Sequence, residues 1–401
     1  MKKKALISAL FIAVIFSVLF FATPFFTSVN YEVPPVAPSA SVGSVVEEVE
    51  EAEEDTAPPF IATHLPTPEP LKAIYMTSWI AGTPSLREPR IMDLLRETEL
   101  NAVVIDIKDD TGKISFNVSD PFLQKFNSSE NRIPGIKELI ARLHEEGVYV
   151  IGRISVFQDP YLTGLRPDLA VKRASDKSVV WTDRKGISWM DASSREVWEY
   201  VVAIGKEAYS IGFDELNFDY IRFPSDGDMR DIYYPLSEER VLADPDLGKA
   251  KILREFFSYL HEEFRDTGAV ISADLFGMTT TNSDDLNIGQ ILEYAAPYFD
   301  YIAPMVYPSH YPKGFNGYED VNKYPYEIVK YSMDKGVEKL IAASSSPSKL
   351  RPWLQDNNYP VTYTAEMVRA QIQATYDAGL TSWMLWDAAN TYTREALLPK
   401  E

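Results

Sequence analysis

The stretch Gly212-Phe213-Asp214-Glu215-Leu216-Asn217-Phe218-Asp219-Tyr220-Ile221-Arg222-Phe223-Pro224 decides the fold class of this chain. Polar and apolar residues alternate with a period of two in its centre, which predicts a β-strand with two different faces. Leu216 and Phe218 share one face, whereas Glu215, Asn217 and Asp219 share the other. Three polar side chains that point into one core are costly unless something there uses them. In a closed parallel barrel, such a strand ends at the functional face of the molecule.

The whole region 71–401 alternates predicted strands with predicted helices. This alternation indicates parallel βαβ units, and eight of them favour a closed (β/α)8 TIM barrel of the α/β class. No Gly-x-Gly-x-x-Gly follows the first strand, which argues against an open nucleotide-binding sheet. Leu340–Ala343 is a competing candidate for the seventh strand. The predicted strands are Ala73–Trp79, Ala102–Lys108, Val148–Ser155, Glu215–Ile221, Val270–Phe276, Tyr301–Tyr307, Leu350–Gln355 and Ser382–Asp387.

The predicted helices carry recognisable start and stop signals. Ser193 and Glu196 have the spacing of a capping box, and Thr364 is placed to cap the last helix. Gly147, Gly212 and Gly379 follow three helices at positions that favour a positive φ. The predicted helices are Arg90–Thr98, Ile136–Glu146, Arg195–Ser210, Lys249–Asp266, Ile288–Ala296, Tyr326–Lys335 and Ala365–Ala378.

Two segments precede the predicted barrel domain at 71–401. Residues 1–29 combine an N-terminal cluster, Lys2 to Lys4, with an almost uncharged run that is long enough to cross a bilayer. We interpret them as a signal anchor or a cleaved signal peptide, and the lysines place the rest of the chain outside the cytoplasm. Residues 30–70 are rich in proline and glutamate and predict a disordered acidic linker. We therefore expect an exported domain that is tethered to the membrane by its N-terminal segment, or secreted if that segment is cleaved.

Composition excludes several functions. The formal net charge of −20 argues against binding to nucleic acid or to an anionic membrane surface, which require clustered Lys and Arg. The chain has no cysteine, so it has no disulfide, no thiolate nucleophile and no Cys-ligated metal. His64, His144, His261 and His310 show no metal-binding spacing, and we predict neither a metal site nor a cofactor. We expect a monomer.

Acidic, amide and aromatic residues gather at the predicted strand ends. Asp219 on the fourth strand and Asp274 on the fifth are the candidates for the two carboxyl groups that flank a glycosidic bond, with Asp219 as nucleophile or base and Asp274 as acid. Aromatic rings cover the apolar faces of sugars, while amides and arginines bind hydroxyl groups. The predicted substrate-binding residues are Asp106, Lys108, Arg153, Glu215, Asn217, Arg222, Tyr307, His310, Trp353, Gln355, Trp386 and Asp387.

Several of these residues have a structural role as their alternative. An inward aspartate such as Asp106 is as often part of an ion-pair layer as of a site, and a single tryptophan such as Trp386 more often packs than stacks on a sugar. His310 is a loop residue or a substrate contact rather than a metal ligand. For Asp219 the functional interpretation is favoured, because an inward Asn217 precedes it and a Tyr-Ile-Arg-Phe-Pro loop follows it.

Five ordered motifs resemble a glycosyl hydrolase-like domain family found in many exported bacterial proteins. They are the stretch 212–224 together with residues 101–110, 303–311, 351–356 and 383–388. The resemblance covers essentially all of 71–401. It implies a barrel distantly similar to those of α-amylase-like and chitinase-like enzymes, and hydrolysis of a carbohydrate that it does not specify.

The better-known barrels match only in part. In α-amylase-like enzymes the nucleophile is an Asp two residues after an Arg; Asp219 takes that position, but Asn217 replaces the Arg. Their general acid is a Glu on strand five, where this chain has Asp274. In chitinase-like enzymes a run of acids ends in a catalytic Glu, and Ile221 occupies that position here, which argues against a substrate-assisted mechanism.

We therefore expect a glycoside hydrolase that acts on an extracellular or cell-wall polysaccharide. The alternative is a non-catalytic carbohydrate-binding barrel at the cell surface, which would keep the aromatic residues and tolerate the loss of either acid. A metal-dependent deacetylase would need a His pair near an Asp, which the sequence does not offer.

Overall fold

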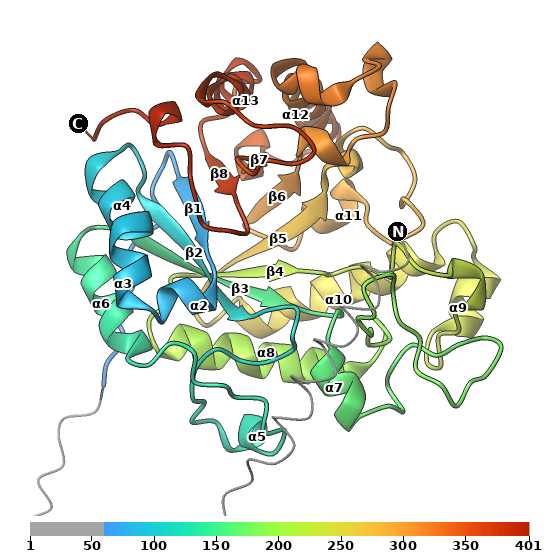
Figure 1. Cartoon of the computed structure of the whole chain (residues 1–401). Coiled ribbons are helices and arrows are strands. Elements are labelled where there is room, and N and C mark those ends of the chain that lie inside the picture. Colours follow the sequence, from blue (N-terminus) through green and yellow to red (C-terminus); the bar gives the residue numbers. More distant parts are fainter. Residues whose placement is uncertain (1–59, 401) are drawn as a thin grey trace, which may run out of the picture. The chain divides into compact units, whose positions relative to one another are not determined.

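A computed structural model describes residues 60–400, and in this part eight parallel strands close into a barrel in chain order. Each strand pairs with the next, and β8 pairs with β1, so the predicted TIM barrel is confirmed. Helices surround the strands (Figure 1). The strands are β1 (Lys72–Met76), β2 (Ala102–Lys108), β3 (Tyr149–Ser155), β4 (Glu215–Asp219), β5 (Val270–Phe276), β6 (Tyr301–Met305), β7 (Trp353–Gln355) and β8 (Trp383–Trp386).

Most of the predicted helices are present, with additional short ones, but the helix predicted at Ile288–Ala296 is only the four residues of α11. The α-helices are α2 (Ser78–Ala81), α3 (Pro84–Arg87), α4 (Asp93–Glu97), α5 (Pro121–Gln124), α6 (Ile136–Glu145), α7 (Pro160–Leu165), α8 (Arg195–Ser210), α9 (Glu238–Ala243), α10 (Gly248–Phe264), α11 (Leu292–Ala295), α12 (Pro325–Ala342) and α13 (Ala365–Asp377). Among residues 60–400, no helix combines the length and the apolar character needed to cross a membrane. The predicted anchor at 1–29 lies outside the described residues, as does the linker up to residue 59.

Strand β4 has the two faces that its alternation predicts. Leu216 and Phe218 belong to the apolar core between the strands and the helices, and are fully buried there. Glu215, Asn217 and Asp219 point to the inside of the barrel. Asn217 aligns with Arg153 of β3 and with Ser272 of β5, so each polar residue of β4 lies in its own layer of the barrel interior.

Three details of the sequence prediction are wrong for local reasons. Strand β1 ends at Met76 instead of Trp79, because the side chain of Thr77 accepts a hydrogen bond from the backbone of Ile80 and caps α2. Leu340–Ala343 is not a strand, since it forms the end of α12. The cap of α8 is Ser194, which accepts from the N–H of Val197, and not Ser193.

Other end signals are confirmed. Thr364 caps α13 by accepting from the backbone of Met367. Gly147, Gly212 and Gly379 all have positive φ, at 73°, 115° and 81°. Glycine reaches such angles without the steric cost of a Cβ.

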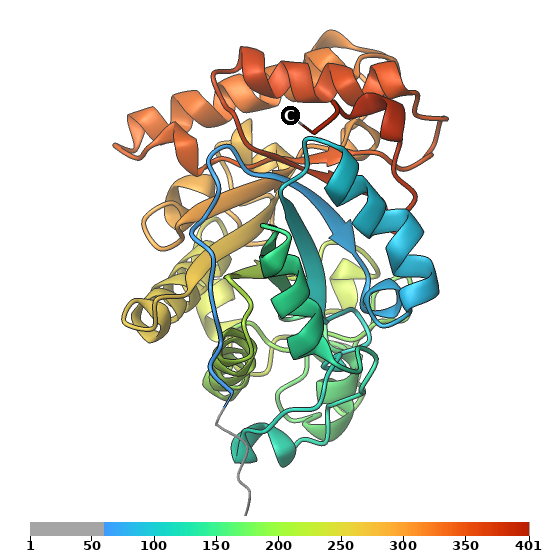
Figure 2. The same ribbon diagram turned by 90° about the vertical axis from the view of Figure 1, so that its left-hand side faces the viewer.

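The segment 60–70, which the sequence assigns to the linker, contacts the barrel, and the compact unit begins at Phe60. The backbone of Leu65 donates a 2.7 Å hydrogen bond to Asp214, which precedes β4. The hydroxyl groups of Thr67 and Tyr149 lie 3.1 Å apart, and Glu69 accepts from Tyr301 at 3.0 Å. Tyr149 and Tyr301 are the first residues of β3 and β6, so this segment, blue in Figure 2, lies at the N-terminal end of the barrel.

Candidate active site

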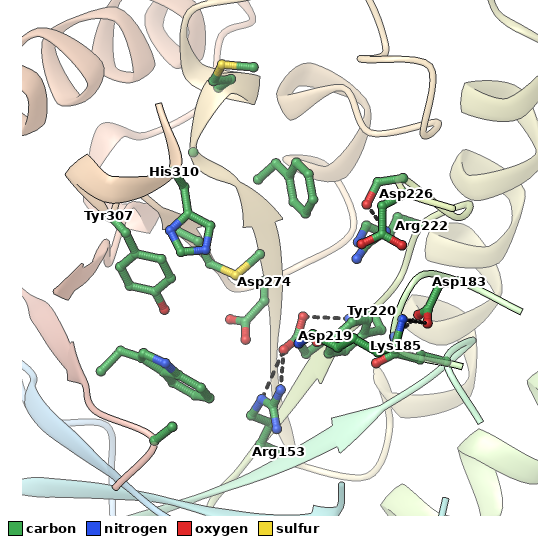
Figure 3. A pocket seen from close by; sticks show the side chains of 18 of the residues that line it. Arg153, Asp183, Lys185, Asp219, Tyr220, Arg222, Asp226, Asp274, Tyr307 and His310 are labelled. Carbon is green, nitrogen blue, oxygen red and sulfur yellow. Dashed lines mark hydrogen bonds and ion pairs between the residues drawn. The ribbon is translucent and has the colours of Figure 1, made fainter. Parts of the chain in front are cut away.

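A cavity of about 550 Å³ opens where β3 to β6 and β8 end. Asp219 of β4 and Asp274 of β5 come from adjacent strands and point into the same space (Figure 3). The cavity is lined by Arg153, Gln158, Asp183, Lys185, Trp189, Asp219, Tyr220, Arg222, Ser225, Asp226, Asp274, Phe276, Gly277, Met278, Met305, Tyr307, His310, Tyr311, Trp386 and Ala388.

Asp219 is held by the guanidinium of Arg153. Arg153 donates to Oδ2 of Asp219 from Nε at 3.0 Å and from Nη2 at 2.5 Å, and to Oδ1 of Asp106 from Nη1 at 2.7 Å. Burial alone would lower the pKa of Arg153, but the carboxylates of Asp219 and Asp106 outweigh it and raise that pKa well above its ordinary value. The backbone N–H of Tyr220 donates to Oδ1 of Asp219 at 2.6 Å. Asp219 is therefore a fixed, ion-paired carboxylate.

The arginine that Asn217 replaces in the comparison with α-amylase-like enzymes is supplied from another strand. Arg153 of β3 aligns with Asn217 of β4 and reaches Asp219 from there. Behind Arg153, the hydroxyl of Tyr75 donates to Asp106. Asp106 thus orients Arg153 and does not line the cavity.

Asp274 has a different environment from Asp219. Its Oδ1 accepts hydrogen bonds from the amide of Asn217 at 2.9 Å and from the indole of Trp353 at 2.8 Å. Its Oδ2 has no hydrogen-bond partner within residues 60–400. Burial, and next the negative charge of Asp219, raise the pKa of Asp274 well above its usual value. Asp274 is therefore suited to carry a proton on Oδ2 at a pH where an ordinary aspartate is ionised.

Aromatic side chains flank the two acids. Trp386 stacks on Tyr75 with ring centroids 4.2 Å apart, and lies edge-on to Trp353 at 5.6 Å. Tyr307 is almost fully buried, and burial, followed by the charges of Asp274 and Asp219, raises its pKa well above the ordinary value. Tyr307 and Trp386 therefore present ring surface beside the acids, which suits the apolar face of a sugar. Tyr307 adds a neutral hydroxyl group.

The loop after β4 turns sharply to place its side chains in the cavity. Tyr220 has φ of +53°, in the left-handed region that costs a bulky residue about 1–3 kcal/mol. The turn brings Tyr220 and Arg222 to the wall beside Asp219. Such strain persists only where surrounding contacts hold it, and the neighbouring Phe223 donates to the carbonyl of Ile288 at 2.8 Å.

Half of the predicted site residues line the cavity. These are Asp219, Asp274, Arg153, Arg222, Tyr307, His310 and Trp386. Asn217 and Trp353 lie behind Asp274 and contact it through hydrogen bonds, as Asp106 contacts Arg153. These three residues position the lining groups.

The other four predicted substrate-binding residues lie in structural contacts away from the cavity. A register shift between Asp106 and Lys108 takes the ammonium of Lys108 to Asp159 at 2.8 Å. Glu215 pairs with Arg351 at 2.8 Å at the opposite end of the barrel. Gln355 donates to the backbone of Asn357 and Tyr359, and the carboxylate of Asp387 accepts from the backbone N–H groups of Ala389 and Thr391. Each of these polar groups already has partners within the protein, so none of the four is free to bind a sugar in this arrangement.

The sequence prediction missed one wall of the cavity. Gln158, Asp183, Lys185 and Trp189 come from the connection 156–194 between β3 and α8. No strand or long helix was predicted there, and an unusually long connection is itself a signal of function. Asp226 and Phe276 were also missed: Asp226 lies in the loop after β4, and Phe276 ends β5 on the same face as Asp274 but carries no polar group that would mark it as a site residue.

Metal-binding geometry is not found in the described part of the chain. No group of three or more His, Cys, Asp or Glu side chains in residues 60–400 is arranged to hold an ion. The polar groups of the cavity are instead arranged as a carboxylate pair with an arginine.

The described residues form a closed (β/α)8 barrel in which two acids from adjacent strands, Asp219 and Asp274, line one cavity. Residues 73–392 match the family described as "Putative glycosyl hydrolase domain", and the chain belongs to this family. No curated protein matches the chain.

Solved structures share the barrel. The glycoside hydrolase domain of PgaB (BpsB) from Bordetella bronchiseptica is 14% identical over 83% of this chain and 100% of that domain, with a TM-score of 0.59. Alpha-L-fucosidase isoenzyme 2 from Paenibacillus thiaminolyticus is 13% identical over 82% of this chain and 48% of its own, with a TM-score of 0.54. A hypothetical protein from Ruminiclostridium thermocellum ATCC 27405 is 33% identical over 50% of this chain and 96% of its own, with a TM-score of 0.43. The first two show a common fold at this low identity.

Proposed function

We propose that this protein is a glycoside hydrolase that cleaves an extracellular or cell-wall polysaccharide, with Asp219 as nucleophile or catalytic base and Asp274 as general acid. The observation that carries the proposal is the contrast between the two acids. Asp219 is ion-paired with Arg153, whereas burial and the charge of Asp219 raise the pKa of Asp274. Hydrolysis of a glycosidic bond requires one carboxyl group that donates a proton and a second that acts as nucleophile or base.

Each group has a defined task in this reaction. The free Oδ2 of Asp274 gives its proton to the leaving glycosidic oxygen. Asp219 either attacks the anomeric carbon or removes a proton from the attacking water, and Arg153 fixes its orientation. Tyr307 and Trp386 cover the sugar ring at the point of cleavage. The separation of the two carboxyl groups in a substrate complex decides between retention and inversion.

The test uses the full chain in detergent micelles and its Asp219→Asn and Asp274→Asn variants. Each is incubated with a panel of bacterial wall glycans and exopolysaccharides, and released oligosaccharides are identified by mass spectrometry. Wild-type protein is expected to release products that neither variant releases at a comparable rate. Family membership and the barrel fold support this expectation.

A non-catalytic binding barrel gives a different result. In that case glycans are retained by the wild type and by both variants, and no glycan is cleaved. Product release by Asp219→Asn at the wild-type rate would also refute the assignment of the nucleophile or base.

A further inference from the structure

Arg222 is a buried cation with a free hydrogen-bonding edge in the wall of the cavity. It is 8% exposed, and its Nη1 donates to the carbonyl of Phe223 at 3.1 Å and to Oγ of Ser225 at 3.0 Å. Its Nε and Nη2 have no hydrogen-bond partner within residues 60–400. Those two N–H groups are the parallel pair with which arginine binds a carboxylate in bidentate fashion.

The surroundings of Arg222 are mostly aromatic. The guanidinium carbon lies 4.7 Å from the ring centres of Trp189 and Phe276 and 5.2 Å from that of Tyr220. Cation–π contacts of this kind stabilise the charge only in part. No carboxylate of the described chain forms an ion pair with Arg222, although Asp219, Asp226 and Asp183 are near enough to affect its titration.

The acids nearest to Arg222 either have other hydrogen-bond partners already or accept only one long hydrogen bond. Both oxygens of Asp183 are occupied: Oδ1 accepts from the backbone of Lys185 and Ile187, each at 2.9 Å, and Oδ2 accepts from Gln158 and Trp189. Asp219 is paired with Arg153. Asp226, at the rim, accepts one long 3.4 Å bond from the backbone of Arg184.

A second cation faces the same space. Lys185 is exposed, lines the cavity and forms no ion pair with any residue in the part of the chain that the structure describes. It lies toward His310 on the opposite wall, since burial and then the charge of Lys185 lower the pKa of His310. Figure 3 shows Lys185 and Arg222 both at the side of the cavity that the loops after β3 and β4 form.

The position of Arg222 is set before any ligand arrives. The side chain of Gln290 donates to the carbonyl of Ile221 at 3.3 Å, and Phe223 is bonded to Ile288 at 2.8 Å, so the backbone on both sides of Arg222 is fixed. Preorganisation of this kind lowers the entropy lost on binding.

In an open cavity, water can solvate the free edge of Arg222. A glycan that fills the cavity displaces this water, and a buried guanidinium left without a counter-charge is strongly unfavourable. A neutral sugar offers only hydroxyl groups as acceptors, whereas a sugar acid offers two coplanar oxygens that match the free Nε and Nη2. The cavity is therefore better suited to an acidic glycan than to a neutral one.

We propose that Arg222, assisted by Lys185, binds the carboxylate of a sugar acid, so that the ligand of this cavity is a uronic-acid-containing glycan. This inference rests on the proposed function for its view of the cavity as a glycan site, and it adds the class of sugar. Arg222 is a specificity-determining residue here and takes no part in bond cleavage.

The test compares glycans that differ only in charge. Oligogalacturonate and hyaluronan oligomers are each titrated calorimetrically beside their carboxyl-reduced forms, in which CH2OH replaces the carboxylate. The full chain is used in detergent micelles with Asp219→Asn as a common background, so that no ligand is consumed. Arg222→Gln, Arg222→Lys and Lys185→Gln are added to this background, and thermal unfolding checks that each variant is folded.

The background protein should bind at least one acidic oligomer about 10- to 100-fold more tightly than its reduced form, the range expected for a hydrogen-bonded charge. Arg222→Gln should abolish this preference while binding the reduced form as before. Arg222→Lys should keep a smaller part of the preference for the acidic oligomer, because lysine has the positive charge but not the two parallel N–H groups of arginine. Lys185→Gln should have the smallest effect, and that effect should fade at high salt.

Equal binding of the charged and reduced forms of both oligomers would overturn the proposal, as would a preference that survives Arg222→Gln. If Arg222→Gln does not fold, the proposal is still tested by the comparison of charged and reduced ligands and by the Arg222→Lys variant. Dextran sulfate and dextran serve as a control for general charge attraction. The proposal would also be overturned if the protein preferred dextran sulfate over dextran as strongly as it prefers the uronic acids, and if Arg222→Gln left that preference unchanged. If the protein cleaves only neutral glycans, the proposed hydrolase function is supported and this inference is contradicted. If it binds acidic glycans tightly but cleaves none, this inference is supported and the hydrolase function is contradicted.

Discussion

The two ends of the barrel interior place the same kinds of residue in different surroundings. At the N-terminal end, Glu215 of β4 accepts hydrogen bonds from Arg351 at 2.8 Å and from Tyr149 at 3.2 Å. At the C-terminal end of the same strand and on the same face, Asp219 accepts from Arg153 and lies open to a cavity of about 550 Å³. Both acids are buried and paired with an arginine.

The difference between the two ends lies in what surrounds each pair. Glu215 is enclosed, and the segment 60–70 contacts Tyr149 and Tyr301, the first residues of β3 and β6. Asp219 has a second acid, Asp274, beside it and open space in front. The two acids therefore differ in access: Glu215 is confined to its ion pair, whereas Asp219 faces a cavity at the strand end where barrel enzymes carry their sites.

The largest expected effect comes from removing one acid at each end. Asp219→Asn should lower kcat/KM on the glycan found by the panel roughly 10⁴-fold, as loss of a central catalytic group does. Glu215→Gln, the matched substitution at the other end, should leave kcat/KM of the folded protein within a few-fold of wild type. Steady-state rates on the two purified variants decide the matter, and a comparable loss in both would show that the two ends are not functionally distinct.

Stability should show the opposite order. Glu215→Gln removes the close, buried partner of Arg351 and leaves it only the half-exposed Glu69 at 3.8 Å, which should lower the free energy of unfolding by about 3–5 kcal/mol. Asp219→Asn should lower it less, because Arg153 keeps its ion pair with Asp106. Urea unfolding of both variants gives the two values. Greater destabilisation by Asp219→Asn would contradict the division between structural and chemical ends.

The pH dependence of activity should depend on Asp274. Because burial and the charge of Asp219 raise its pKa, wild-type kcat/KM should fall on the alkaline side as Asp274 loses its proton. Asp274→Asn should lose this alkaline limb along with about 10²- to 10⁴-fold in rate. An aryl glycoside whose leaving group needs no proton should recover much of that rate. A variant that keeps the wild-type alkaline limb would mean that another group is the acid.

The same raised pKa has a consequence for stability. A group whose pKa is higher in the folded state contributes fully below its unfolded value, about 3.9 for aspartate, and this contribution is lost as the pH rises through the folded pKa. Asp274→Asn should therefore be more stable than wild type at neutral pH, with the difference shrinking towards pH 3. Thermal unfolding across this range measures it, and a pH-independent difference would argue against a protonated Asp274 in the folded protein.

The smallest effect is expected at Trp353. Trp353→Phe removes the indole N–H that donates to Oδ1 of Asp274 and that lowers its pKa. The alkaline limb of kcat/KM should therefore move to higher pH, with only a few-fold change in the maximal rate. A shift to lower pH would mean that the hydrogen bond has the opposite effect on the acid.

The sequence by itself determined the barrel, the two faces of β4 and the placement of Asp219 and Asp274 at the strand ends that open onto the cavity. These features follow from local patterns, since period-two alternation fixes which side chains share a face and the strand–helix repeat fixes the parallel sheet. The sequence by itself could not determine which polar residues contact one another. Lys108 and Glu215 have the same local pattern as Asp219, yet they end in structural ion pairs with Asp159 and Arg351.

Only the tertiary structure decided the contacts between strands. The partnership of Arg153 with Asp219 depends on the register of β3 against β4, and that of Trp353 with Asp274 on closure of the barrel, which brings together residues far apart in the chain. The wall that carries Arg222 and Lys185 depends on how the loops after β3 and β4 fold over the strand ends. Such contacts depend on register, loop path and burial together, and no local pattern of residues encodes them.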